Sequence, residues 1–188
     1  MINHVRGDQA ARPIHGDTRT GAGHNDKTAT EEVNMGKHAL CIGITDYPGT
    51  DSDLAGCVND AHDWAAELRQ RGFEVTLLLD HEATLAAMTA SLAELIRNAR
   101  KGDTVVITYS GHGTWVPDSS GYEPDGRDEG LCPYDIEAAG PLLDDEIRRL
   151  LSARAAGARI LLISDSCHSG SVRFPRFFVF QRAVFMLP

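Results

Sequence analysis

Apolar and polar side chains follow two alternating periods along residues 37–172. Four runs of apolar sequence have strand length, at residues 38–44, 73–79, 104–109 and 159–164. Three segments carry apolar side chains three or four positions apart, which predicts helices at residues 54–71, 84–100 and 144–155. This alternation predicts an α/β domain whose mostly parallel sheet has right-handed crossovers and helices on both faces.

One long segment, residues 110–143, breaks the alternation because it shows neither period. Connections longer than about 15 residues are uncommon in compact domains, and they are usually functional or mobile. We therefore expect residues 110–143 to form a functional loop between the third strand and the third helix.

The composition is that of a single globular domain. The chain has 188 residues, of which 42% are hydrophobic and 24% are charged, enough to bury a core. No apolar segment follows Met1, and no run reaches the roughly 18 residues of a membrane span, so we expect no membrane partner. The four cysteines form no closely spaced pair, which favours free thiols in a reducing compartment such as the cytoplasm.

The net charge of -9 is concentrated in one part of the chain. Residues 118–146 contain ten acidic side chains and a single basic one, Arg127, whereas the remainder is balanced. An acidic patch repels the phosphates of nucleic acids and attracts cations and basic peptides. The charge distribution therefore predicts that nucleic acid is not a partner.

A histidine and a cysteine follow two of the predicted strands. His112 lies three residues beyond the run 104–109, and Cys167 lies three residues beyond the run 159–164. Because α/β proteins bind ligands at the carboxyl ends of parallel strands, both side chains should share one sheet edge. An imidazole within hydrogen-bond reach converts a thiol into a nucleophilic thiolate. The pair predicts a cysteine hydrolase with Cys167 as nucleophile and His112 as general base; a buried structural cysteine and a solvated histidine are the alternatives.

The sequences around these two residues resemble the catalytic motifs of a known family. The segments YSGHG and DSCHSG place His112 and Cys167 55 residues apart and resemble the caspase-fold cysteine peptidases (peptidase C14), most closely bacterial-type metacaspases. The resemblance runs over about residues 37–172. It implies a caspase-like fold and cysteine endopeptidase activity, with the backbone amides of Gly113 and Cys167 forming the oxyanion hole.

The resemblance also implies a substrate class. Asp60 lies in the segment GCVNDA, which resembles the GCxNDA segment of metacaspases, and Asp165 precedes Cys167 by two residues. In that family the two matching aspartates line an acidic S1 pocket that selects Arg or Lys at P1, the residue before the cleaved bond. We therefore expect protein or peptide substrates with a basic P1 residue. The alternatives are a solvated or capping carboxylate for Asp60 and a turn-forming residue for Asp165.

The acidic segment holds a candidate metal site. Asp128, Asp144 and Asp145 resemble acidic positions that bind an activating calcium ion in some metacaspases, although the chemistry itself requires no cofactor. Calcium prefers six to eight oxygen ligands, several of them carboxylates. A further acidic ligand expected shortly after the cysteine is missing from this sequence. A solvated acidic loop is the alternative.

The two ends of the chain differ from the central, large-subunit domain at 37–172. Residues 1–36 are rich in Gly, Thr, Asp, Asn and His and predict a disordered leader or propeptide. Residues 173–188 contain five of the six phenylalanines, interleaved with arginines, and do not resemble the small-subunit region with which the family continues. We interpret them as an aberrant apolar and basic tail after a truncation, with a genuine edge strand or a docking tail as alternatives.

A missing small subunit has two consequences. The sheet edge beside residues 159–164 would be unpaired, which predicts self-association or poor solubility. It also leaves a rival function open, in which the chain is an inactive or regulatory caspase-fold fragment acting as an interaction module.

Overall fold

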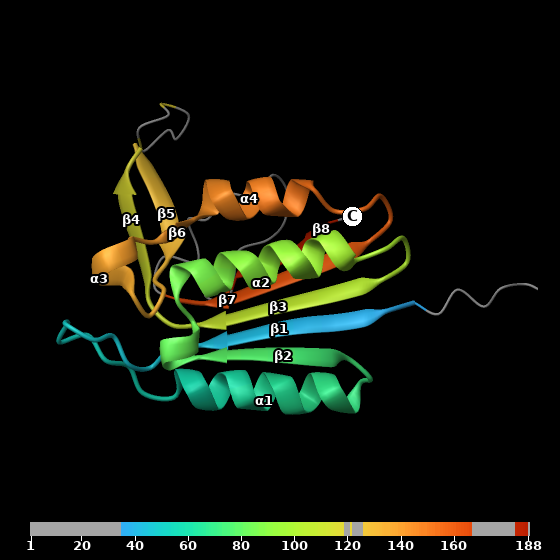
Figure 1. Ribbon diagram of the computed structural model, residues 1–188, viewed down its shortest axis with the longest axis horizontal. Coiled ribbons are helices and arrows are strands. Elements are labelled where there is room, and N and C mark those ends of the chain that lie inside the picture. Colours follow the sequence, from blue (N-terminus) through green and yellow to red (C-terminus); the bar gives the residue numbers. More distant parts are fainter. Residues whose placement is uncertain (1–34, 119–120, 122–125, 167–182, 188) are drawn as a thin grey trace, which may run out of the picture. The chain divides into compact units, whose positions relative to one another are not determined.

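The computed structural model describes residues 35–118, 121, 126–166 and 183–187 (Figure 1). Most of the predicted leader, the predicted nucleophile Cys167 and most of the predicted tail lie outside the described residues. The hypotheses about these segments therefore stay predictions.

Five strands form the central sheet. Their order is β2 (Glu74–Leu79), β1 (Lys37–Gly43), β3 (Thr104–Ser110), β7 (Arg159–Asp165) and β8 (Ala183–Leu187). The first four are parallel, so their carboxyl ends meet at one edge, toward which the arrowheads point in Figure 1. Each of these four strands begins and ends within one residue of its predicted run. The predicted mostly parallel α/β sheet is confirmed.

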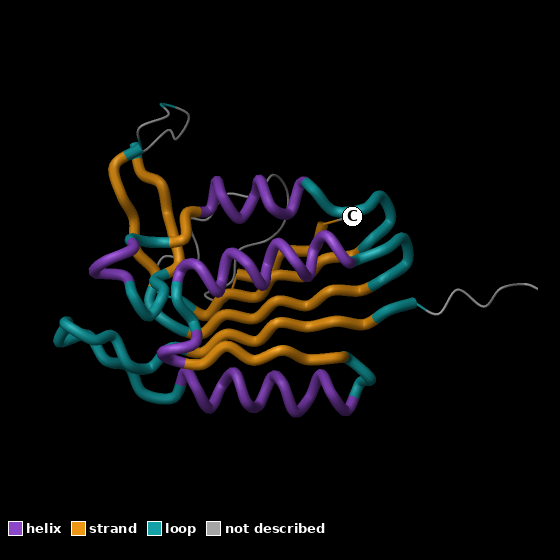
Figure 2. The backbone as a smooth tube through the Cα atoms, viewed as in Figure 1, coloured by secondary structure: helices purple, strands orange, loops and turns teal. Residues whose placement is uncertain are grey.

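Helices cover both faces of the sheet, with α1 on one side of the strands and α2 and α4 on the other (Figure 2). Their bounds are Cys57–Gln70 for α1, Leu85–Asn98 for α2 and Asp144–Ser152 for α4. Alternate residues of β1 divide the core in two, because successive strand side chains point to opposite faces. Leu40 and Ile42 pack in the cluster that α2 and α4 cover, and Ala39 and Cys41 pack against α1.

Local sequence signals set the helix ends. The side chain of Thr84 accepts a hydrogen bond from the Ala87 N–H (3.2 Å) and caps the start of α2. Gly72 follows α1 with a left-handed φ of 80°, as the C-terminal end of a helix favours. Helix α1 begins at Cys57, three residues later than predicted, because Gly56 before it has a φ of 98° and interrupts the helical backbone.

The prediction that residues 110–143 form one connecting loop was wrong. The segment contains a three-stranded antiparallel sheet of β4 (Gly113–Pro117), β5 (Arg127–Leu131) and β6 (Leu142–Leu143), with the short helix α3 (Ile136–Ala139) between β5 and β6. Strand β5 has the sequence RDEGL, and its acidic side chains Asp128 and Glu129 are buried. A strand that buries carboxylates lacks the apolar alternation from which strands are predicted.

The expectation of an unpaired sheet edge was also wrong over the described residues. Strand β8 pairs antiparallel with β7, and Ile160 to Ser164 each face a partner residue. Residues 183–187 therefore form an edge strand of the sheet, and the origin of the tail stays a prediction. Finally, none of the helices in the described part of the chain combines the length and apolar character needed to cross a membrane.

Candidate active site

Strands β3 and β7 run side by side and end at the same edge of the sheet. Ser110, the last residue of β3, is in register with Asp165, the last residue of β7. Beyond them, the Gly111 N–H donates to the Asp165 carbonyl oxygen (3.4 Å). His112 comes next in the chain. The distance between His112 and Cys167 stays a prediction, because Cys167 lies just outside the described residues.

The His112 ring is held by the loop that follows β1. Its Nε2 lies 2.6 Å from the carbonyl oxygen of Ser52, and its ring centroid lies 4.9 Å from that of Tyr47, with 52° between the planes. A carbonyl oxygen only accepts hydrogen bonds, so in the neutral imidazole Nε2 carries the proton and Nδ1 carries the lone pair. The ring is half-buried. This arrangement leaves Nδ1 as the nitrogen that can take a proton from a neighbouring acid.

Asp60 and Asp165 line one pocket. Its volume is about 240 Å³, and its lining comes from α1 and the ends of β3 and β7, namely Asp60, Asp63, Trp64, Glu67, Tyr109, Ser110, Ile163 and Asp165. The Ser110 hydroxyl donates to Oδ2 of Asp60 (2.9 Å), which fixes that carboxylate at the pocket wall. Four of the eight lining side chains are acidic. The pocket therefore suits a positively charged group.

The pKa of the Cys57 thiol responds to the negative charge around this pocket. Burial raises the pKa of the Cys57 thiol, and the negative charges of Asp60 and Asp165 raise this pKa further, whereas a hydrogen bond with Ser110 lowers it. The electrostatic potential of both carboxylates therefore reaches the buried Cys57 thiol at the start of α1.

Gly43 lets α1 approach β1 closely enough to carry Asp60 to the edge. A Cβ atom at Gly43 would lie against the carbonyl oxygen of Cys57 and 2.8 Å from Cβ of Ala61. Glycine is the residue that allows two backbones to come this close. Because Asp60 lies in the first turn of α1, the Gly43 contact controls where its carboxylate stands.

Gly113, the second predicted contributor to an oxyanion hole, begins β4 at the same edge. Together with His112 it lines a cavity of about 210 Å³, to which Tyr47, Ser52 and Cys132 also contribute. The amide of Cys167 lies outside the described residues, so the oxyanion hole stays a prediction.

The acidic residues predicted to bind calcium lie around Arg148. Nη2 of Arg148 is 3.1 Å from Oδ2 of the buried Asp144, and Nη1 of Arg148 bonds Asp145. Burial raises the pKa of Asp128, Asp118 and Asp145 raise it further, and Arg148 lowers it. The three predicted calcium ligands therefore lie near one another, but the positive charge that balances them comes from Arg148.

This arrangement does not fit a calcium ion as it stands. Within the described ranges, no group of three or more His, Cys, Asp or Glu side chains is placed to hold a metal ion. One observation favours a cation nonetheless: Oδ1 of Asp128 is buried and has no hydrogen-bond partner among the described residues.

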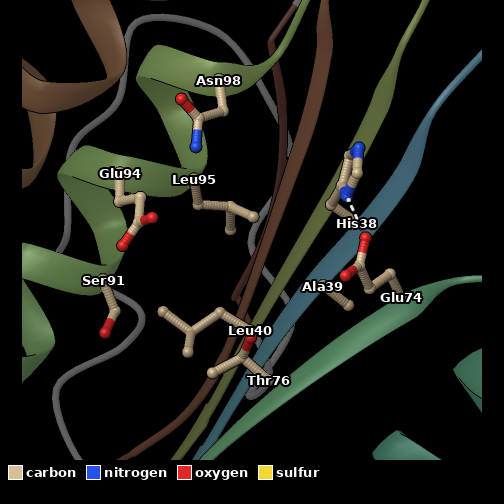
Figure 3. Close-up of a pocket in the computed structure, with 9 residues that line it drawn as sticks. All are labelled: His38, Ala39, Leu40, Glu74, Thr76, Ser91, Glu94, Leu95 and Asn98. Atoms are coloured by element: carbon tan, nitrogen blue, oxygen red, sulfur yellow. Dashed lines mark ion pairs between the residues drawn. The ribbon is translucent and has the colours of Figure 1, made fainter.

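A third cavity, of about 280 Å³, lies at the amino ends of β1 and β2 (Figure 3). It is formed by the first residues of β1 and β2 and the second half of α2, where Nδ1 of His38 is 3.3 Å from Oε2 of Glu74. These are the amino ends of the parallel strands, opposite the edge that carries His112. The lining contains no cysteine, so this cavity is not the candidate active site.

Sequence reasoning missed three residues of the site, namely Tyr47, Ser52 and Ser110. Ser52 acts through its main-chain carbonyl, which any residue type would supply, so the sequence holds no signal for it. Tyr47 lies in the turn after the first strand, at the same sheet edge as His112. This position could have indicated Tyr47 as a site residue, because loops at the carboxyl ends of parallel strands form the binding sites of α/β proteins.

Comparison with known proteins places this chain in one class, the caspase-like cysteine peptidases. The family model "Metacaspase, peptidase C14 domain" matches residues 37–173. The chain is 43% identical over 148 residues to metacaspase-7 of Arabidopsis thaliana and 40% identical over 146 residues to metacaspase-1 of Cryptococcus neoformans. The chain belongs to the metacaspase family.

The matches cover most of this chain and a smaller part of its relatives. They span 73% of this chain and 36% of Arabidopsis metacaspase-7, and 72% of this chain and 32% of the Cryptococcus protein. The chain thus spans about a third of the length of these relatives. A crystal structure of protein GSU0716 from Geobacter sulfurreducens has the same fold, with a TM-score of 0.62 and 42% identity over 70% of this chain and 50% of that one.

Proposed function

We propose that this chain carries cysteine endopeptidase chemistry, with Cys167 as nucleophile and His112 as general base, directed to peptide bonds after Arg or Lys. The observation that carries the proposal is the pairing, at one sheet edge, of an oriented imidazole with an acidic pocket. His112 follows β3, and the pocket with Asp60 and Asp165 lies between α1 and the ends of β3 and β7. Family membership supports the peptidase class.

The reaction follows from the tautomer of His112. Nδ1 accepts the thiol proton of Cys167, and the thiolate attacks the carbonyl carbon of the substrate. The tetrahedral oxyanion would be held by the amides of Gly113 and Cys167. The C–N bond then breaks, and the protonated imidazole gives its proton to the leaving amine. Water transfers a proton to Nδ1 and attacks the thioester. Cleavage of the C–S bond releases the acid, and the imidazolium returns its proton to the Cys167 thiolate.

The acidic pocket supports a basic P1 residue. A guanidinium makes charge-assisted, often bidentate hydrogen bonds with carboxylates, and an ammonium pairs with them as a point charge. Asp60 and Asp165 stand in the same pocket, and Asp63 and Glu67 add further negative charge. An aspartate at P1 would meet this pocket with like charge, so the pocket disfavours the substrate class that animal caspases select.

Kinetics with matched peptides test the specificity. In Asp60→Asn or Asp165→Asn, kcat/KM should fall about tenfold to hundredfold for Arg peptides and change little for a peptide with a neutral P1 residue. Glu94→Gln is the matched control, because it removes one negative charge from the remote cavity at the other end of the sheet. Equal losses for both peptides, or a preference for Asp at P1, would contradict the assignment.

We also propose that calcium binds at Asp128 together with Asp144 and Asp145, by replacing Arg148 as their counter-charge. The support is the buried Asp128 oxygen without a hydrogen-bond partner among the described residues and the nearby carboxylates that raise its pKa. No step of the chemistry above depends on this ion. Calcium should raise the melting temperature of the wild type but not that of Asp128→Asn. Calorimetry without heat at millimolar calcium would remove the proposal.

The proposed location is a reducing compartment, the cytoplasm. Cys41 and Cys57 are buried free thiols. Thiols that persist without pairing fit a reducing environment. Expressing the chain with an export signal and counting its thiols tests this location. We expect these thiols to be oxidised or lost outside the cytoplasm. An exported protein that keeps its thiols and its stability would argue against a cytoplasmic location.

A further inference from the structure

Two tyrosine hydroxyls hold the main chain of His112 from both sides. The His112 N–H donates to Oη of Tyr47 (2.8 Å). Oη of Tyr109 lies 2.6 Å from the His112 carbonyl oxygen and 2.9 Å from that of Cys132, so it donates to this pair of carbonyls. The N–H of Cys132 also donates to the His112 carbonyl (3.0 Å). Both polar groups of the His112 backbone are therefore bonded.

The two hydroxyls come from different parts of the chain and meet in the core. Tyr47 belongs to the loop after β1, and Tyr109 belongs to β3; their side chains are 1% and 2% exposed. The oxygens are 3.4 Å apart, close enough for Tyr47 to donate to Tyr109. Oη of Tyr47 also lies 3.5 Å from the Cys132 carbonyl oxygen, so the Tyr47 hydroxyl accepts from the His112 N–H and has two acceptors for its own proton, Tyr109 and Cys132.

Gly111 shows how tightly this arrangement is built. A Cβ atom at Gly111 would lie 2.6 Å from both tyrosine hydroxyls, which no residue other than glycine allows without displacing them. The ring of Tyr47 also contacts the imidazole of His112, so one side chain touches both the backbone and the ring of the proposed base. Burial raises the pKa of Tyr47 to about 12 and the pKa of Tyr109 well above its usual value, so both hydroxyls keep their protons at neutral pH.

We propose that Tyr47 and Tyr109 are positioning residues, which fix the backbone of His112 so that Nε2 meets the Ser52 carbonyl and Nδ1 remains the basic nitrogen. This inference rests on the proposed role of His112 as general base. Without the Tyr47 hydroxyl, the half-buried His112 N–H loses its acceptor, and the segment must shift to find another. The contact between Nε2 and Ser52 then loosens, and fewer molecules hold the reactive tautomer.

Tyr47→Phe is the test, because it keeps the ring and removes only the hydroxyl. We expect kcat for an Arg peptide to fall about tenfold to hundredfold while KM stays unchanged, since the Asp60 pocket is not touched. The rate at which iodoacetamide alkylates Cys167 should fall, and its dependence on pH should change. Tyr109→Phe should act in the same direction. Tyr134→Phe is the matched control and should keep wild-type kinetics, because the Tyr134 ring contacts His81 and lines neither the Asp60 pocket nor the His112 cavity.

A second readout does not require activity. The imidazole nitrogen chemical shifts of His112 in wild type should show a proton on Nε2, and in Tyr47→Phe they should show a mixture of tautomers. Unchanged shifts and unchanged kinetics would overturn the inference. The proposed function fails in a different way, namely if His112→Ala keeps the wild-type rate. An inactive His112→Ala together with a Tyr47→Phe that matches Tyr134→Phe would leave the base in place and refute only the positioning role.

Discussion

Substituting Gly43 by alanine probes the contact that carries Asp60 to the sheet edge. The φ angle of Gly43 is not positive, so the backbone itself accepts alanine there. A Gly→Ala change at such a position usually stabilises a protein by about 0.4–1 kcal/mol, because it restricts the unfolded chain. At Gly43 the new Cβ would instead meet the carbonyl of Cys57, with the carbonyl carbon at 3.0 Å, and Cβ of Ala61 at 2.8 Å.

The sign of the effect follows from these neighbours. Backbone atoms cannot rotate out of the way, so α1 must move off β1, and such overpacking destabilises by about 1–3 kcal/mol. Subtracting the gain of about 0.4–1 kcal/mol leaves a net loss of about 0–2.6 kcal/mol, centred near 1.3 kcal/mol. For a domain of about 150–250 residues, a loss of about 1.3 kcal/mol lowers the melting temperature by roughly 3–5 °C.

The assay combines melting curves with substrate kinetics. Gly72→Ala is the matched control, because its φ of 80° strains alanine by about 1 kcal/mol while a Cβ there meets nothing within 4 Å. Both variants should lose stability, but only Gly43→Ala should also raise KM for Arg peptides, since only it displaces Asp60. A Gly43→Ala protein at least as stable as wild type would refute the reasoning.

The other predictions address pH, charge and the sheet edge. Because burial moves the pKa of Tyr47 from 10.0 to about 12, its neutral form stabilises the fold fully below pH 10, and this stability is lost as the pH rises toward 12. Between pH 10 and pH 12, the free energy of unfolding measured in urea should fall on the order of 3 kcal/mol more for wild type than for Tyr47→Phe. An equal dependence of this free energy on pH in both proteins would contradict the prediction. Asp128→Asn should be more stable than wild type at neutral pH in a chelator, because it removes a buried charge whose pKa is raised; a less stable variant in urea unfolding would oppose this. Deleting residues 183–188 removes β8 and should lower the melting temperature and increase light scattering, because β7 becomes an exposed edge; a more soluble, equally stable protein would show that β8 is dispensable.

The sequence predicted those parts of the fold whose side chains follow a period. The four parallel strands are apolar runs, and their order predicted that the residues after β3 and after β7 share one sheet edge, where Ser110 is in register with Asp165. The small sheet around β5 escaped prediction because its strand buries Asp128 and Glu129, so residues 110–143 showed no strand period and were expected to form one loop. A buried carboxylate needs partners distant in the chain, such as Arg148, and those are set by the tertiary fold.

The site was predictable to the same degree. Asp60 and Asp165 were expected in one pocket from motif resemblance, and they line one pocket in the structure. The support of His112 by the Ser52 carbonyl and the Tyr47 hydroxyl was not predictable, because the contacts join segments 60 and 65 residues apart. Neither contact belongs to a recognisable motif or a secondary-structure period.

Mapping the cysteine that an affinity probe alkylates tests the central claim most directly. The probe is a short peptide ketone with Arg at P1 and a reactive leaving group, and the full chain is analysed by intact mass and peptide mapping. A single adduct at Cys167 is predicted, lost in His112→Ala and slowed in Asp60→Asn, with the buried Cys41, Cys57 and Cys132 unlabelled. Labelling of another cysteine, or equal labelling of Cys167 in His112→Ala, would contradict the account.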